Sequence, residues 1–239
     1  MYSLDWGLIL RSLPDLLAGS LTTLLLTTTS IGIGLVLGTI MGLMRLSRVK
    51  AVGAFAAGYV WFFRGTPLLV QIMLIYYALP HLGVSMDRWQ AGVTALSLNS
   101  AAYIAEIVRA GVQSIDIGQT EAAWALGLTR WQTVRFIILP QAFRRIIPPL
   151  GNEFILLLKD SSLVSVIALE ELLRKGQLIV TRSFKPIEIY AMVAIMYLVM
   201  TTLISLLVSV TERRLRLQTR TTQNTRRRRL GGIAAPRIP

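Results

Sequence analysis

The chain has 239 residues, of which 54% are hydrophobic and only 15% are charged. A soluble domain carries roughly 25% charged residues, so the composition indicates a membrane protein. The formal net charge is +13, but nine arginines and one acid lie from residue 212 onward. A basic segment directly after an apolar span is typical of a cytoplasmic flank that faces anionic membrane lipid, so no nucleic-acid partner is expected.

Residues 1–15 form a short polar lead with the turn SLPDL and are expected outside the membrane. The first span is predicted over Leu16–Met44, where Gly34, Gly38 and Gly42 recur at every fourth position. This spacing places the three glycines on one helix face and lets another helix approach closely. The approaching helix could belong to a second subunit, but packing within the chain is the favoured interpretation.

The second apolar stretch covers Gly65–Met86 and includes Pro67. Proline has no N–H to donate and restricts the residue before it, so the helix should kink or restart there. A third span begins at Trp89 and ends near Glu106 and Arg109. These two charges are one helical turn apart and are expected to form an intrahelical ion pair at the membrane interface.

The next segment, 120–140, is half polar and is predicted to be a hairpin of two short helices. Thr120 is the expected N-cap of the first helix, and Gly127 can take the left-handed conformation that ends it. The segment TRWQ (129–132) has the spacing of a capping box for the second helix, which Pro140 should terminate. Because the hairpin is too short and polar to span, its first helix should lie exposed on the cytoplasmic side, or the two helices form an amphipathic pair at the membrane interface.

The fourth apolar region, Ile146–Leu173, is interrupted by Glu153, Lys159 and Asp160. Each charge inside a membrane segment costs about 2.5–3.5 kcal/mol, so these side chains should face protein or water and pair. A cluster of both signs could hold a zwitterionic solute, or it could tie helices together as a structural ion pair. The candidate residues for a solute pathway are Asn99, Tyr103, Glu153, Lys159, Asp160 and Ser161.

The fifth span covers Ile189–Thr211, and residues 212–239 form a basic tail that is predicted to be disordered. Basic residues follow the first, third and fifth spans, which places those ends in the cytoplasm and the N-terminus outside. Four basic residues between the fourth and fifth spans oppose this orientation but are outweighed: Arg174, Lys175, Arg182 and Lys185. The sequence therefore predicts a multi-pass protein of the bacterial inner membrane.

Residues for catalysis are poorly represented. His81 is the single histidine, so a paired-histidine zinc motif cannot form, and the absence of cysteine excludes thiolate metal sites. No Gly-Lys pair occurs, so the chain lacks a Walker-type phosphate-binding loop of its own. No catalytic residue, metal site or resident cofactor is expected, and ATP with Mg²⁺ would have to bind another subunit.

The hairpin resembles the EAA signature of bacterial ABC importer permeases. The matching pattern is Glu121-Ala122-Ala123, three residues, Gly127, nine residues, Ile137, one residue, and Leu139-Pro140. Three further segments resemble the polar amino acid branch of that family: FRGTPLLVQ (63–71), AAYIAEIVRAGVQSI (101–115) and LLKDSSLVSVI (157–167). The resemblance extends over about residues 15–215, whereas the tail beyond residue 217 has no counterpart.

The resemblance implies an all-α, five-transmembrane-helix permease domain over residues 16–211. It would pair with a copy of itself or a homologous subunit, with two ABC ATP-binding subunits and with an external solute-binding protein. The solute would be a polar amino acid, either glutamate-, glutamine- or aspartate-like or basic. The first hairpin helix would couple to the ATPase through Glu121, Ala122, Ala123, Gly127, Leu139 and Pro140.

Two other classes of protein remain open from the residues alone. A secondary amino acid transporter would explain the spans and the intramembrane charges, but it has no use for a docked hairpin and often shows internal repeats, which this sequence lacks. A structural or assembly protein would explain the glycine-rich face and the basic tail, but not the charges near Lys159.

Overall fold

The computed structural model describes residues 5–230 and the side chains of residues 5–211, and the regular structure in that part of the chain is helical. This confirms the predicted all-α class. The α-helices are α1 (Trp6–Met44), α2 (Lys50–Gly65), α3 (Leu68–Met73), α4 (Arg88–Gln113), α5 (Ile117–Ala125), α6 (Arg130–Gln132), α7 (Leu139–Asp160), α8 (Leu172–Ser183) and α9 (Pro186–Leu230). Shorter π- or 3₁₀-helical turns cover Leu74–Ala78, Leu79–Leu82, Thr133–Ile138 and Ser161–Ile167.

Among the described residues, three helices are long and apolar enough to cross a membrane: α1, α4 and the part of α9 over Pro186–Thr211. A fourth crossing is formed if α2 and the helical segment Leu68–Leu82 count as one bent span, with 103° between them. The bend follows from Pro67, because Thr66 before it is extended, at φ −115° and ψ 145°. The predicted kink is therefore confirmed, whereas the count of five spans stays a prediction.

The N-terminal turn predicted at SLPDL is wrong, because α1 runs through it. Asp5 caps the helix by accepting a hydrogen bond from the N–H of Leu8 at 2.9 Å. Pro14 lies inside the helix and costs it one backbone hydrogen bond. Ser12 and Leu16, on either side of the proline, are buried, so packing holds this first part of α1 in helical form.

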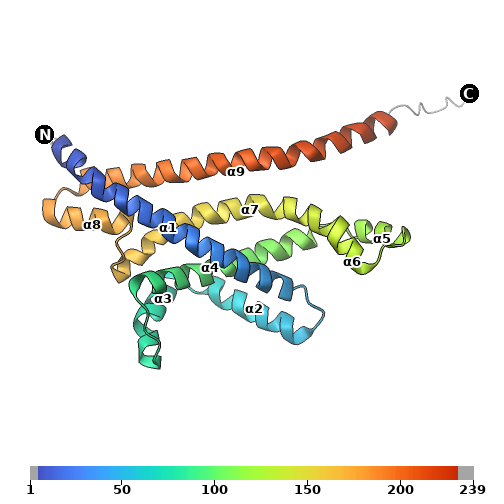
Figure 1. Ribbon diagram of the computed structural model, residues 1–239, viewed down its shortest axis with the longest axis horizontal. Helices are drawn as coiled ribbons and strands as arrows, with labels where there is room; N and C mark the ends of the chain where they lie inside the picture. The colour runs from blue at the N-terminus through green and yellow to red at the C-terminus, as the bar shows by residue number, and fades with distance from the viewer. Residues whose placement is uncertain (1–4, 231–239) are drawn as a thin grey trace, which may run out of the picture.

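The glycine face of α1 packs against α4, as Figure 1 shows where the two helices cross. A Cβ atom on Gly34 would lie 2.8 Å from the Ser100 hydroxyl oxygen, and one on Gly38 would lie 2.6 Å from the Cβ of Ile104. A Cβ on Gly42 would lie 2.8 Å from a backbone oxygen of α4. Packing within the chain is thus confirmed as the reason for the spacing.

The apolar region predicted as one span over residues 146–173 is divided into separate elements. The helix α7 ends at Asp160, a 3₁₀ segment follows, and Ala168 has a left-handed φ of 56° before α8 begins. Glu171 is fully buried and accepts hydrogen bonds from two N–H groups of the first turn of α8, at 2.7 and 2.8 Å. The Tyr197 hydroxyl donates to the same carboxylate at 2.7 Å. This buried acid ends the predicted span because it caps α8 and ties it to α9.

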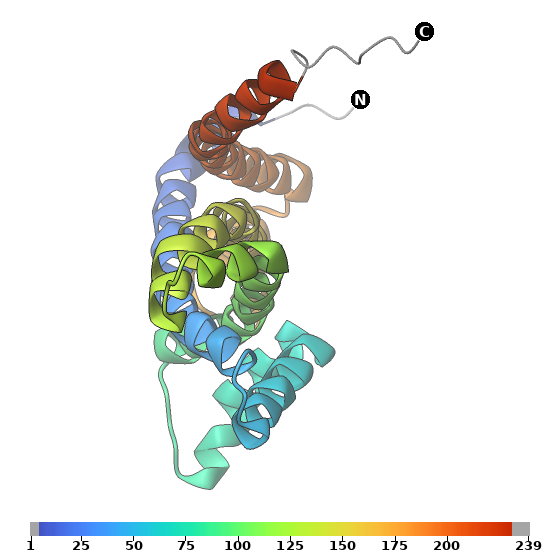
Figure 2. The ribbon, with the colours of Figure 1, turned by 90° about the vertical axis from the view of Figure 1, so that its right-hand side faces the viewer.

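The basic segments gather at two opposite ends of the molecule. The end of α1, the α5–α6 hairpin and the far end of α9 lie at one end, whereas the N-terminus and α8 lie at the other (Figure 1). Figure 2 views the molecule from the hairpin end. Two of the opposing basic residues are paired with acids, Lys175 with Glu170 at 2.6 Å and Lys185 with Glu188 at 4.0 Å. The hydrogen bond from Lys175 holds the pKa of Glu170 below its ordinary value.

The basic tail begins as a continuation of α9, whose backbone is helical to Leu230. Residues 231–239 lie outside the described residues. The predicted disorder of the tail stays a prediction.

Candidate functional site

The first helix of the hairpin, α5, begins earlier than the sequence pattern indicates. Its N-cap is Asp116, whose carboxylate accepts a hydrogen bond from the N–H of Gly118 at 2.7 Å. The predicted N-cap Thr120 is therefore wrong and lies within the helix. Because α4 is capped at Ser114, only a short link separates the end of α4 from the start of α5. Glu121 then lies in the middle of α5 and is exposed.

The turn of the hairpin has the predicted chemistry. Gly127 has a φ of +78°, and its N–H donates to the carbonyl of Trp124 at 2.9 Å. The predicted capping box is also confirmed: the Gln132 side chain accepts from the Thr129 N–H at 2.8 Å, and the Thr129 hydroxyl accepts from the Gln132 N–H at 3.4 Å. The left-handed glycine and the cap together produce a sharply defined turn.

Pro140 does not terminate the second helix, so that prediction is wrong. A π-helical turn over Thr133–Ile138 leads directly into α7, and Pro140 lies in the first turn of that helix. The Leu139 N–H donates to the carbonyl of Val134, five residues back. Pro140 therefore lies within continuous helical structure, directly after the π-helical turn. The hairpin is therefore continuous with α7.

The hairpin lies at one end of the molecule (Figure 1) and exposes large apolar side chains. Ile117 is 69% exposed, Leu126 is 81% exposed and Trp131 is 70% exposed. Of the residues predicted to contact a partner, Ala123 is buried, and the others are exposed: Glu121, Ala122, Gly127, Leu139 and Pro140. Several exposed large apolar side chains on an element that does not span the membrane favour an interaction site.

The predicted pathway residue Asn99 is buried and belongs to a hydrogen-bonded amide pair. Its Nδ2 donates to the side-chain oxygen of Gln71 at 3.0 Å. Gln71 in turn donates to the backbone oxygens of Phe63 at 2.8 Å and Thr66 at 3.1 Å. The pair thus supplies hydrogen bonds to carbonyls that lose their helical partners at the break caused by Pro67. Sequence reasoning missed Gln71, although a glutamine in an apolar run just after a proline is a usable signal.

The remaining pathway candidates lie along α7 and on α4. Glu153 is buried, and among the described residues no side chain donates a hydrogen bond to it, although Asp160 and Arg64 lie within electrostatic range. Lys159 and Asp160 are exposed at the end of α7. The structure also buries Ser161, which donates to a backbone carbonyl at 2.7 Å, and leaves Tyr103 37% exposed. The α7 residues are therefore brought together along one helix, whereas Asn99 is bonded elsewhere.

Glu106 forms the predicted intrahelical pair with Arg109, at 2.6 Å. The structure adds Arg45, at the end of α1, which forms an ion pair with the other oxygen of Glu106. Burial lowers the pKa of Arg45, and the neighbouring charges of Arg109 and Arg64 lower it further. Sequence spacing could not reveal this third member, because it comes from a distant helix.

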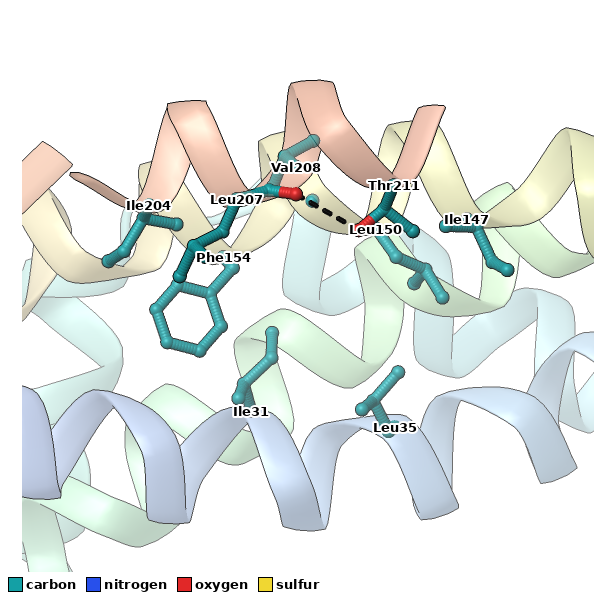
Figure 3. Close-up of a pocket in the computed structure, with 10 residues that line it drawn as sticks. Ile31, Leu35, Ile147, Leu150, Phe154, Ile204, Leu207, Val208 and Thr211 are labelled. Atoms are coloured by element: carbon teal, nitrogen blue, oxygen red, sulfur yellow. Dashed lines mark hydrogen bonds between the residues drawn. The ribbon is translucent and has the colours of Figure 1, made fainter. Parts of the chain in front are cut away.

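An apolar groove lies between α1, α7 and α9 (Figure 3) and has a volume of about 450 Å³. Its lining includes Ile31 and Phe154. The lining also includes Thr211, whose hydroxyl already donates to the Leu207 carbonyl at 2.9 Å. A polar solute would lose its hydration there without gaining hydrogen bonds. The groove is therefore excluded as a pathway for such a solute.

These features define a class of protein: an all-α membrane protein with intramembrane polar residues and a surface hairpin suited to a partner subunit. The model of the family described as "binding-protein-dependent transport system inner membrane component" matches residues 34–217. The chain belongs to this family.

The curated relatives cover almost the whole chain. The glutamine transport system permease protein of Escherichia coli (strain K12) is 41% identical over 215 residues, which are 89% of this chain and 98% of the relative. The glutamate/aspartate import permease protein of Escherichia coli O6:H1 is 41% identical over 222 residues, which are 90% of this chain and 99% of the relative. A chain from the crystal structure of an amino acid ABC transporter with histidines is 42% identical, with a TM-score of 0.85, and the match covers 89% of this chain and 100% of that chain.

Proposed function

We propose that the chain is the permease subunit of an ATP-driven importer for polar amino acids. It would pair with a second permease subunit, with ABC ATP-binding subunits that carry ATP and Mg²⁺, and with an extracytoplasmic solute-binding protein. The observation that carries the proposal is the capped, exposed α5–α6 hairpin in a chain of this family. The printed names of the relatives, which include glutamine, glutamate/aspartate and arginine permeases, support an amino acid as the solute.

The hairpin is connected to the pathway candidates by continuous helix. From α6 through the π-helical turn and α7, the chain carries the hairpin directly to Glu153 and Asp160. One side-chain contact also braces the hairpin, because Gln141 of α7 donates to Gln119 of α5 at 3.3 Å. Arg145 of α7 donates to the carbonyl of Ser114, at the end of α4 just before the hairpin. Rigid-body motion of a docked hairpin would therefore move α7. This supports α5 as the element that couples the chain to an ATPase.

The pathway is proposed to include the candidates along α7, with charges of both signs to contact a zwitterionic amino acid. Glu153 supports this role, because a buried acid without a hydrogen-bond donor among the described residues is available to a bound ammonium group. Ser161 and Tyr103 would add hydroxyl groups. The hydrogen bonds of Asn99 instead favour a role in holding the α2–α3 bend.

The proposed orientation in the inner membrane places the hairpin and the far end of α9 in the cytoplasm and the N-terminus outside. Support comes from the gathering of the hairpin and the ends of α1 and α9 at one end of the molecule (Figure 1). The lysines of α8 and of the link after it, which oppose this orientation, have acid partners.

Substitutions of Gly127 test the coupling role. No atom lies within 4 Å of a Cβ built at this position, so a small side chain fits, and asparagine and aspartate both tolerate the left-handed conformation. Gly127→Asp, however, places a negative charge at the end of α5, where the helix dipole and a docked partner disfavour it. We expect Gly127→Asp to abolish ATP-dependent amino acid uptake while the protein still reaches the membrane.

Gly127→Asn is the matched control, because it has the same shape without the charge, and it should retain most of the uptake. Both variants are compared in proteoliposomes that contain the ATPase subunits, with co-purification of the ATPase as a second measurement. Normal uptake with Gly127→Asp would refute the coupling assignment. Uptake by the chain without any ATPase would indicate a secondary transporter instead.

A further inference from the structure

A second cavity, of about 530 Å³, lies near the hairpin, where α2, α4 and α7 meet. This volume is within the range of small-molecule sites, roughly 300–1,000 Å³. The cavity reaches the start of the hairpin, because its lining residue Ser114 caps the end of α4 and lies just before α5. The residues that line it are Arg64, Glu106, Ile107, Ala110, Gly111, Ser114, Arg145 and Pro149.

Positive charge is in excess around this cavity. Glu106 is the one acid of the lining, and its two oxygens are already engaged by Arg45 and Arg109. The other charged residues of the lining are Arg64 and Arg145. The lining therefore holds two arginines besides a carboxylate that Arg45 and Arg109 already neutralise. A concave site with a net positive charge attracts small anions.

The two lining arginines retain free donor capacity. Among the described residues, neither Arg64 nor Arg145 forms an ion pair. Arg64 lies over the ring of Tyr103, at 5.2 Å from its centroid, and Arg145 donates one N–H to the carbonyl of Ser114. A guanidinium group carries five N–H donors in a planar fork that fits a carboxylate in bidentate fashion.

We propose that this cavity binds the carboxylate group of a small organic acid, through Arg64 and Arg145, at the hairpin end of the permease. The walls made by Ile107 and Pro149 would cover the carbon chain of such a ligand, which inorganic phosphate does not have. Because Glu106 is already engaged, the cavity offers no free acid for an ammonium group. The site therefore recognises the carboxylate end alone.

The inference rests on the proposed function for its biological ligand, which is the transported amino acid at the cytoplasmic mouth. Arg145 connects the site to the coupling hairpin, because its hydrogen bond to Ser114 joins α7 to the end of α4. A bound carboxylate would compete with the Ser114 carbonyl for the same guanidinium group. Occupancy of the cavity is thereby linked to the contact between α7 and the end of α4, just before the hairpin.

The test uses the complex of the permease with its ATPase subunits in lipid nanodiscs, without the binding protein. Binding of L-glutamate, succinate and inorganic phosphate is measured by calorimetry. We expect L-glutamate and succinate to bind, and Arg64→Gln or Arg145→Gln to weaken both by about 10- to 100-fold, as for the loss of a hydrogen bond to a charged group. Arg144→Gln is the matched control, because Arg144 is exposed and does not line the cavity, and it should bind as the unchanged protein does.

Three results would overturn the inference. Phosphate could bind as tightly as succinate does, or Arg144→Gln and Arg145→Gln could weaken binding equally. The third is that succinate still binds to the double variant Arg64→Gln with Arg145→Gln. Succinate separates this cavity from the α7 cluster, which is expected to need an ammonium group. Size-exclusion profiles of the variant complexes confirm that each is folded. ATP-driven amino acid uptake by the unchanged complex is measured in parallel, so its absence would refute the proposed function independently of this site.

Discussion

The close contact between α1 and α4 predicts that a larger side chain at Gly38 destabilises the protein. A Cβ atom at this position would lie 2.6 Å from the Cβ of Ile104 and 2.7 Å from the backbone oxygen of Ala101. Neither atom is the far end of a flexible side chain, so the two helices have to move apart. Gly38→Ala should therefore destabilise the permease by displacing one helix from the other.

The size of the effect follows from these distances. Carbon atoms pack at about 3.5–4.0 Å, so the helices have to separate locally by roughly 1 Å. A gap of that size forfeits about a quarter to a half of the dispersion energy of each contact. Overpacked cores lose about 1–3 kcal/mol, which corresponds to a lower Tm by about 2–12 °C for a protein of this length.

The measurement is thermal unfolding in detergent, followed by tryptophan fluorescence, with the monodisperse fraction after heating as a second measure. Gly32→Ala is the matched control, because Gly32 is in the same helix and no atom lies within 4 Å of its added Cβ. Equal Tm values for Gly38→Ala and Gly32→Ala would contradict a close contact between α1 and α4 at Gly38.

Two further predictions concern polar side chains. Tyr197→Phe removes the hydroxyl that donates to Glu171 at 2.7 Å, so the free energy of unfolding should fall by about 1–3 kcal/mol in a detergent thermal assay. Asp160→Asn removes one charge of the proposed pathway, so loaded binding protein should stimulate the ATPase less in the reconstituted complex.

Each of these changes has a control. Tyr190→Phe alters an exposed tyrosine of the same helix and should leave the stability unchanged, so equal losses in Tyr190→Phe and Tyr197→Phe would contradict the role of the Glu171 bond. Glu170→Gln alters an exposed acid outside the predicted pathway and should leave stimulation intact. Unchanged stimulation with Asp160→Asn would contradict a pathway role for this residue; among the described residues Asp160 forms no ion pair.

Local chemistry was predictable where a residue acts on its own backbone. Pro67 breaks the second span, Gly127 takes the left-handed conformation, and the capping box after it forms as expected. Each of these effects depends on dihedral preferences and hydrogen bonds within a few residues. The same local rules wrongly predicted that Pro14 lies in a turn and that Pro140 ends a helix. Both lie inside helices, where packing or the position in the helix outweighs the cost of a proline.

Composition and spacing along one helix were enough to predict the all-α class, the apolar helices, the small-residue face of α1 and the hairpin signature. The packing of the helices was needed to show which helix meets that face, that Glu171 caps α8 from a buried position, and that Arg45 joins the pair of Glu106 and Arg109. Such contacts join residues far apart in the chain. Their geometry depends on how the helices pack, and no periodicity along one helix encodes it.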